Sequence, residues 1–231
     1  MLFLQTLWEG IVNGSIYAMI AMGIALVWGV MGILSFSQGE FMMLGMFITF
    51  YANTYLGLDP VVCVPIVGLL MFGFGCIVYR TIIAKALRGP RLSQRLITFA
   101  IGMVLTYGAL MLFGGQYRTV QNLAFTGSID LVGLTISRQK LVPLIIALVM
   151  VAFMYIFLNK TMIGKAIQAT SQDKQAAELV GIDSETTYMV AFGLSSALAG
   201  IAGCAITYYF PVYYTAGAAF LLFGFIAVLL G

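Results

Sequence analysis

The stretch from Gly10 to Leu58, GIVNGSIYAMIAMGIALVWGVMGILSFSQGEFMMLGMFITFYANTYLGL, decides the fold. Its 49 residues are almost all apolar, and Glu40 is the only charged side chain among them. A helix needs about 20 apolar residues to cross ~30 Å of hydrocarbon at 1.5 Å per residue. The stretch is therefore long enough for two crossings, and the polar residues between Ser35 and Glu40 divide it into two spans of suitable length.

The whole chain has the composition of an integral membrane protein. Apolar residues make up 62% of its 231 residues and charged residues 8%, against roughly a quarter charged in a soluble domain. The apolar runs are twice the length of a barrel strand and do not alternate, which excludes a β-barrel. We expect an all-α polytopic bundle that forms a single transmembrane domain over residues 1–231. It should have about seven spans, near residues 10–33, 37–57, 60–79, 95–114, 141–158, 187–209 and 216–231.

Basic residues in the loops predict the orientation. Segments 80–95 and 159–186 together carry eight lysines and arginines, whereas segment 115–140 carries three. Basic loops favour the cytoplasmic side, so the first two segments should be cytoplasmic. The N-terminus is then outside, and the turn from Ser35 to Glu40 lies near the inner surface.

Several kinds of chemistry lack their required residues. The chain has no histidine, no GxxxxGK[ST] loop and no GxSxG motif, so no catalytic set, metal site or ATP-hydrolysing site is predicted. The net charge is only +3, and we expect no nucleic-acid partner and no cofactor. The sequence therefore indicates a passive scaffold that is not an enzyme and that something else drives or opens.

Small residues on the sixth predicted span mark a packing face. Ser196, Gly200 and Gly203 recur at helix-packing intervals, and such residues let helices approach closely in a membrane. Packing inside one bundle is a better explanation for them than a seam between two chains.

Two interpretations of the Ser35–Glu40 turn remain open, and they do not exclude each other. Ser37 and Glu40 have the spacing of a capping box, in which each side chain accepts a hydrogen bond from the other residue's amide. Alternatively, the turn lines or gates a transport pathway, because an ionisable group in a membrane protein is a functional candidate. The pathway candidates are Ser35, Ser37, Gln38 and Glu40.

The polar segment 160–186 has a helical pattern with one small-to-apolar side. Gly181 is placed to end this helix in a left-handed cap, with Ile182 packing back after it. Such a helix could insert into a groove of another protein. The alternative is a solvated connecting loop, and the pattern alone does not choose between them.

Four motifs resemble one family of transporters. The pattern AxxxxxxAAELVGID, from Ala169 to Asp183, resembles the cytoplasmic coupling segment of ABC-importer permeases. GSIYAMIAMGIALVWGVMGILSFSQGEFMMLG (14–45), GLSSALAGIAG (193–203) and FGFIAVLLG (223–231) are similar to stretches of the branched-chain amino-acid permease family, which includes urea and short-amide permeases. Family members read Asn-Phe-Ala-His-Gly-Glu where this chain has Ser-Phe-Ser-Gln-Gly-Glu at 35–40, and they continue past the region that ends at Gly231. The resemblance thus implies a chain that is shortened at its C-terminus.

This resemblance implies an ATP-driven importer for branched-chain amino acids or related small polar solutes, in a bacterial inner membrane. Its partners would be two ABC ATPase subunits that hydrolyse ATP, a second related permease subunit, and a periplasmic or extracellular binding protein. The residues implied to lie on the coupling helix are Ala169, Asp173, Ala176, Ala177, Gly181 and Ile182. A stand-alone channel for a small neutral solute such as urea, and a non-transporting remnant, stay open as alternatives.

Overall fold

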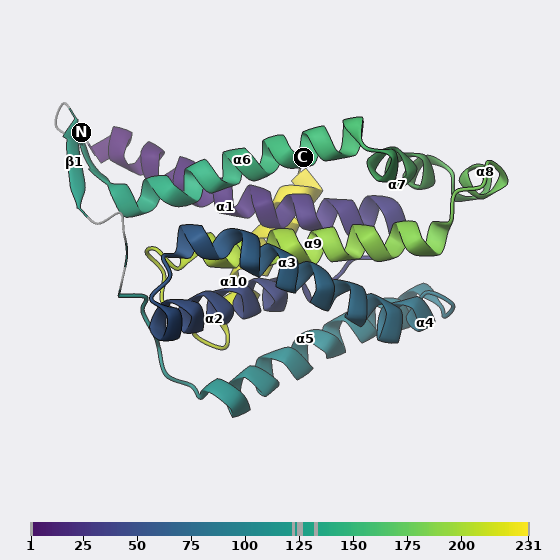
Figure 1. Cartoon of the computed structure of the whole chain (residues 1–231), viewed down its shortest axis with the longest axis horizontal. Helices are drawn as coiled ribbons and strands as arrows, with labels where there is room; N and C mark the ends of the chain where they lie inside the picture. Colours follow the sequence, from purple (N-terminus) through teal and green to yellow (C-terminus); the bar gives the residue numbers. More distant parts are fainter. Residues whose placement is uncertain (1, 122, 124–126, 132–133, 231) are drawn as a thin grey trace.

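The computed structural model describes residues 2–121, 123, 127–131 and 134–230, and it is a bundle of helices (Figure 1). The predicted all-α, polytopic class is confirmed, with one small hairpin added. The elements are α1 (Leu2–Met31), α2 (Gln38–Leu56), α3 (Pro60–Val78), the π-helix η1 (Tyr79–Ile83), α4 (Ala84–Ala86), α5 (Arg91–Phe113), β1 (Ser128–Leu131), β2 (Leu134–Ser137), α6 (Arg138–Lys160), α7 (Met162–Gln172), α8 (Lys174–Leu179), α9 (Ser184–Ile206) and α10 (Ala216–Leu230).

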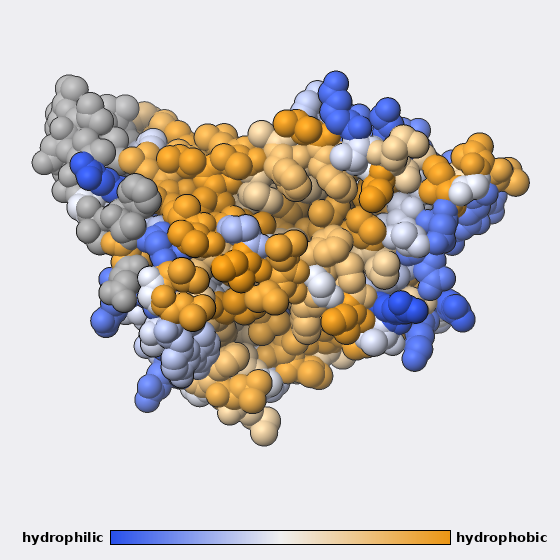
Figure 2. All heavy atoms as spheres, in the orientation of Figure 1, coloured by the Kyte–Doolittle hydropathy of each residue, from blue (hydrophilic) through white to orange (hydrophobic). Residues whose placement is uncertain are grey.

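Five helical stretches among the described residues are long and apolar enough to cross a membrane. They are Gln5–Met31, Pro60–Ala86, Leu92–Phe113, Arg138–Lys160 and Ser184–Ile206. The other two predicted spans also form helices, but α2 carries more polar residues and α10 has only 15 residues. An apolar surface occupies the middle of the molecule, with hydrophilic side chains gathered at its two ends (Figure 2). The chain is therefore a multi-pass membrane protein.

Helix α9 is the centre of the bundle because its small residues let three other helices pack closely against it. A Cβ added at Gly45 of α2 would lie 2.3 Å from the carbonyl oxygen of Gly200, so the two backbones are in contact. The Ser195 hydroxyl donates to the Gly23 carbonyl of α1 at 2.6 Å, and the Ser196 hydroxyl donates to the Met71 carbonyl of α3 at 3.0 Å. The expectation that this face packs inside the bundle is confirmed.

The two ends of the bundle differ in what they contain. Helices α4, α7 and α8 lie at one end, and the N-terminus and the β1–β2 hairpin lie at the other (Figure 1). The hairpin is antiparallel, with Ser128 opposite Ser137, and no sequence pattern predicted it. The two basic segments, 80–95 and 159–186, thus share one end, which we call the coupling end. That this end faces the cytoplasm stays a prediction.

Candidate functional site

The chain turns back into the bundle after α1. Gly32 has a left-handed backbone with φ +68°, and its amide donates to the Trp28 carbonyl at 2.8 Å. Glycine adopts this conformation without steric cost, so Gly32 ends α1 and reverses the chain. Thr98 of α5 then contacts the returning segment. Its hydroxyl accepts from the Phe36 amide at 3.4 Å, and it shares its hydrogen between the Arg95 carbonyl of its own helix at 2.8 Å and the Leu34 carbonyl at 3.4 Å.

Glu40 consequently lies well along the length of the bundle, away from the coupling end. The Thr106 hydroxyl donates to Glu40 Oε1 at 3.1 Å. Thr106 is 15 residues beyond Arg91, the first residue of the 23-residue helix α5, which places it roughly 22 Å along that helix. The expectation of a turn near the inner surface is wrong, because residues 32–37 run inward beside α5 before α2 begins.

The predicted capping box does not form. Ser37 holds the N-cap position of α2, but its backbone is helical (φ −85°, ψ −2°) and its side chain makes no capping bond. A capping residue needs an extended backbone to aim its oxygen at the helix amides. The Ser37 hydroxyl instead lies 3.1 Å from that of Ser35, and Glu40 binds Thr106. The position of the carboxylate is therefore explained by α5 and not by a helix cap.

The four pathway candidates are adjacent in the chain but do not form one cluster of side chains. Ser35 and Ser37 are buried and contact each other. Gln38 and Glu40 are two residues apart on a helix, so their side chains project about 200° apart. Gln38 is fully buried, and among the described residues neither its side-chain amide nor Glu40 Oε2 has a hydrogen-bond partner. Such orphaned groups are rare in folded proteins, so the turn remains a candidate for transport.

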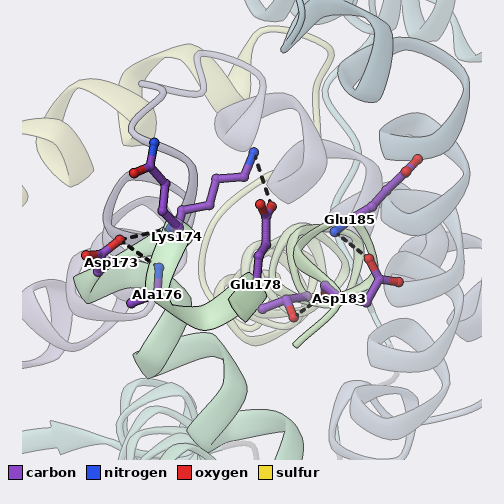
Figure 3. A network of polar contacts seen from close by, with 8 residues as sticks. Asp173, Lys174, Ala176, Glu178, Asp183 and Glu185 are labelled. Atoms are coloured by element: carbon purple, nitrogen blue, oxygen red, sulfur yellow. Dashed lines mark hydrogen bonds and ion pairs between the residues drawn. The ribbon is translucent and has the colours of Figure 1, made fainter. Parts of the chain in front are cut away.

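The polar segment 160–186 forms two helices that are separated at Asp173. Asp173 leaves the helical conformation (φ −151°, ψ 106°), and its Oδ1 accepts from the amides of Gln175 at 2.9 Å and Ala176 at 3.1 Å, which caps α8 (Figure 3). The other end of α8 is the predicted left-handed cap. Gly181 has φ +87°. Its amide donates to the backbone carbonyl of Glu178 at 3.1 Å, and the Ile182 amide donates to the Ala177 carbonyl at 3.0 Å. This pair of bonds is a Schellman motif, so the predicted cap is confirmed.

Burial divides the residues of the implied coupling helix into two groups. Ala177 is only 3% exposed and packs within the chain, while Ala169 and Ile182 are half-buried. Asp173, Ala176 and Gly181 are exposed. Leu179 and Val180 are 88% and 78% exposed, and with Ala176 they form what we call the α8 tip. Leu179 was not among the sequence candidates. The available signal was the apolar pair Leu179-Val180 directly before the capping Gly181.

A hollow of about 530 Å³ lies behind α8, walled by the start of α9 and by η1 and α4. Lys174 and Glu178 of α8 form an ion pair at 3.7 Å on one wall (Figure 3). Asp183 is fully exposed and caps α9. Hydrogen bonds from the Thr186 hydroxyl and the Glu185 amide hold the pKa of the Asp183 carboxyl below its usual range. The hollow therefore carries charged groups whose positions are fixed by two helix starts.

Comparison with known proteins matches nearly the whole chain to one family. Residues 6–231 match the family described as "Branched-chain amino acid transport system / permease component". The chain is 30% identical to the permease protein BraD of Pseudomonas aeruginosa, over 87% of this chain and 69% of BraD. It is also 30% identical to the permease protein LivH of Escherichia coli, over 91% of this chain and 72% of LivH.

A weaker match, 25% identical over 81% of this chain and 49% of the relative, is to the permease protein LivM of Escherichia coli. Both LivH and LivM are named as permease proteins of a high-affinity branched-chain amino acid transport system. No solved structure matches the chain. The family match covers far more than half of the sequence, and it agrees with the polytopic bundle and with the resemblance found in the motifs. The chain belongs to the permease-component family of branched-chain amino acid transport systems.

Proposed function

We propose that the chain is a membrane-spanning subunit of an ATP-driven importer of branched-chain amino acids or related small polar solutes. It would reside in a bacterial inner membrane with the coupling end in the cytoplasm. Because its sequence has no nucleotide-binding motif, ATP hydrolysis belongs to separate ABC ATPase subunits. The matches to both LivH and LivM support a second, related permease subunit in the same transporter. A binding protein on the opposite side would deliver the solute.

The observation that carries the ATPase assignment is the α8 tip. Leu179 and Val180 are almost fully exposed. Helix α8 lies outside all five candidate spans, so lipid does not explain why these two apolar side chains are exposed. An apolar patch in such a place marks an interaction site. A short helix that presents an apolar face is suited to a groove in a partner protein. The α8 tip is therefore the surface that docks into an ATPase subunit.

The bundle connects this surface to the proposed pathway. Only residues 180–183 separate α8 from α9, and α9 is in direct contact with α1, α2 and α3. A displacement of α8 by the ATPase therefore acts on the central helix of the bundle. Close-packed helices respond by sliding or rotating as units. Helix α2, which carries Gln38 and Glu40, would move with α9, so the polar turn at mid-depth would be opened or closed.

Copurification tests the docking surface. The permease is coexpressed with the ATPase subunits of its transport system, and the ATPase retained on tagged permease is measured. Leu179→Arg should reduce retention at least about tenfold, because buried interface anchors contribute about 2 kcal/mol or more. Gln172→Arg adds the same charge at an exposed position on α7 and should retain the ATPase. Ala177 is not suitable for this test, since an arginine there would disrupt the chain's own packing.

Equal retention by the Leu179→Arg variant and the wild-type chain would refute the docking assignment. ATP-independent solute flux through liposomes that contain the chain alone would refute the proposed function as a whole. The two results are separate, because docking is measured without transport and flux is measured without an ATPase.

A further inference from the structure

Five charged residues line the hollow behind α8: Lys174 and Glu178 pair with each other, Asp183 accepts the hydrogen bonds that cap α9, and Arg88 and Glu185 remain. Arg88, which follows α4, and Glu185, in the first turn of α9, both line it. Within the described part of the chain, the ion pairs are Lys140–Glu9 and Lys174–Glu178, so neither Arg88 nor Glu185 takes part in one. Both side chains belong to exposed residues. A guanidinium and a carboxylate without an ion-pair partner therefore line the same hollow.

A third polar group lies in the wall of the same hollow. Ser184 also lines it, and this residue is only 6% exposed. Its hydroxyl has no hydrogen-bond partner among the described residues. A buried hydroxyl without a partner costs free energy, and a polar ligand in the hollow would supply the missing bond.

Part of the remaining wall suits an aliphatic side chain. Ala84 and Leu87 line the hollow from α4 and its C-terminal end, and Ile182 lines it from the cap of α8. The volume of about 530 Å³ lies within the ~300–1,000 Å³ range of small-molecule sites. A singly charged ligand would leave either Arg88 or Glu185 unpaired, whereas a zwitterion can satisfy both.

We infer that this hollow is a binding site for a free zwitterionic amino acid with an aliphatic side chain, at the coupling end of the bundle. The guanidinium of Arg88 binds the α-carboxylate, for which its planar, paired donors are suited. The carboxylate of Glu185 binds the α-ammonium group, and the Ser184 hydroxyl donates to the ligand carboxylate. The aliphatic side chain lies against Leu87 and Ile182. The choice of a branched-chain amino acid rests on the proposed function, but the recognition of a zwitterion does not.

This site is separate from the transport pathway proposed at Ser35–Glu40, which lies at mid-depth. It shares a wall with α8, since Lys174 and Glu178 line it as well. An amino acid that has accumulated on this side of the membrane would therefore contact the helix that is proposed to receive the ATPase. The site is thus placed to report the product concentration to the coupling segment.

Calorimetric titration of the full-length permease in lipid nanodiscs with L-leucine tests the inference. We expect saturable binding that Arg88→Gln and Glu185→Gln each weaken at least tenfold. Arg95→Gln removes the same charge from an exposed residue at the same end that does not line the hollow, and it should bind L-leucine like the wild-type chain. Isoamylamine and 4-methylpentanoate are leucine without its carboxylate and without its ammonium group, respectively, and both should bind at least tenfold more weakly than L-leucine.

Three results would overturn the inference. One is the absence of saturable binding at millimolar L-leucine. Another is binding that Arg88→Gln and Glu185→Gln leave unchanged, which would place the ligand elsewhere, for example at the mid-depth turn. The third is loss of ATPase retention in the Arg88→Gln and Glu185→Gln variants without any binding of L-leucine, which would make the hollow part of the protein interface. Failure of the proposed function would instead appear as normal L-leucine binding with no ATPase retained by the wild-type chain.

Discussion

Replacing Gly45 with alanine tests the contact between α2 and α9 that holds the bundle together. The new Cβ would lie 2.3 Å from the Gly200 carbonyl oxygen and 2.6 Å from the Gly200 Cα, while ordinary contacts begin at 3.4 Å. The two helices would have to separate by about 1.1 Å (3.4 − 2.3) to admit one methyl group. Both obstructing atoms belong to a helix backbone, so no side-chain rotation can relieve the clash. Overpacking of this kind costs about 1–3 kcal/mol.

The matched control is Gly73→Ala in α3. A Cβ at Gly73 would have no atom within 4 Å, so alanine there should gain about 0.5–1 kcal/mol from its better helix propensity. The two variants should therefore differ by about 1.5–4 kcal/mol in the free energy of unfolding. Denaturant and thermal unfolding of both proteins in the same detergent would measure the difference. Equal stabilisation by the two substitutions would refute a backbone contact between α2 and α9.

Three further substitutions test other parts of the bundle. Glu40→Gln keeps an oxygen that can accept the α5 hydrogen bond, so the unfolding midpoint should change little. Amino-acid uptake by the assembled transporter in vesicles should be lost, and unchanged uptake would remove the residue from the pathway. Ser195→Ala removes a buried 2.6 Å bond to the Gly23 carbonyl and should lower the unfolding free energy by about 0.5–1.5 kcal/mol; no loss in thermal melts would contradict the bond. Lys140→Met breaks a half-exposed ion pair with Glu9, worth about 0–1 kcal/mol, so a larger loss of stability would show that the pair matters more than its exposure allows.

The sequence was sufficient for the features that local chemistry determines. Apolar runs of about 20 residues predicted the helices, and the small residues around Gly200 predicted where they pack. The glycine after an apolar pair predicted the left-handed cap at Gly181, because only a residue without a Cβ adopts that conformation freely. In each case, the residues that form the pattern are the same residues that form the helix, the packing face or the cap.

Features that depend on distant partners were not predictable in this way. The spacing of Ser37 and Glu40 is that of a capping box, but Thr106, which is 66 residues away, takes the carboxylate instead. The depth of the turn depends on where the chain re-enters after Gly32, and hydropathy does not record that reversal. The sequence places Ala177 on a docking face, but in the structure this residue is buried within the chain. Leu179, which one-dimensional periodicity gave no reason to single out, becomes a candidate only when its exposure is known.

The reversal at Gly32 also determines how the bundle is sealed beside α5. On the coupling side of Glu40, the layer next to α5 is filled by the non-helical residues 32–37. Among the described residues, the hydrogen bonds between this segment and α5 use one hydroxyl, that of Thr98. A helix in this layer would have to move as a whole, whereas this short non-helical segment can move by breaking two 3.4 Å hydrogen bonds and the packing of the Phe36 ring against Phe99 and Phe225. If the proposed pathway runs past Glu40, residues 32–37 lie on its inner side, and we expect this segment to move before any of the spans unwinds.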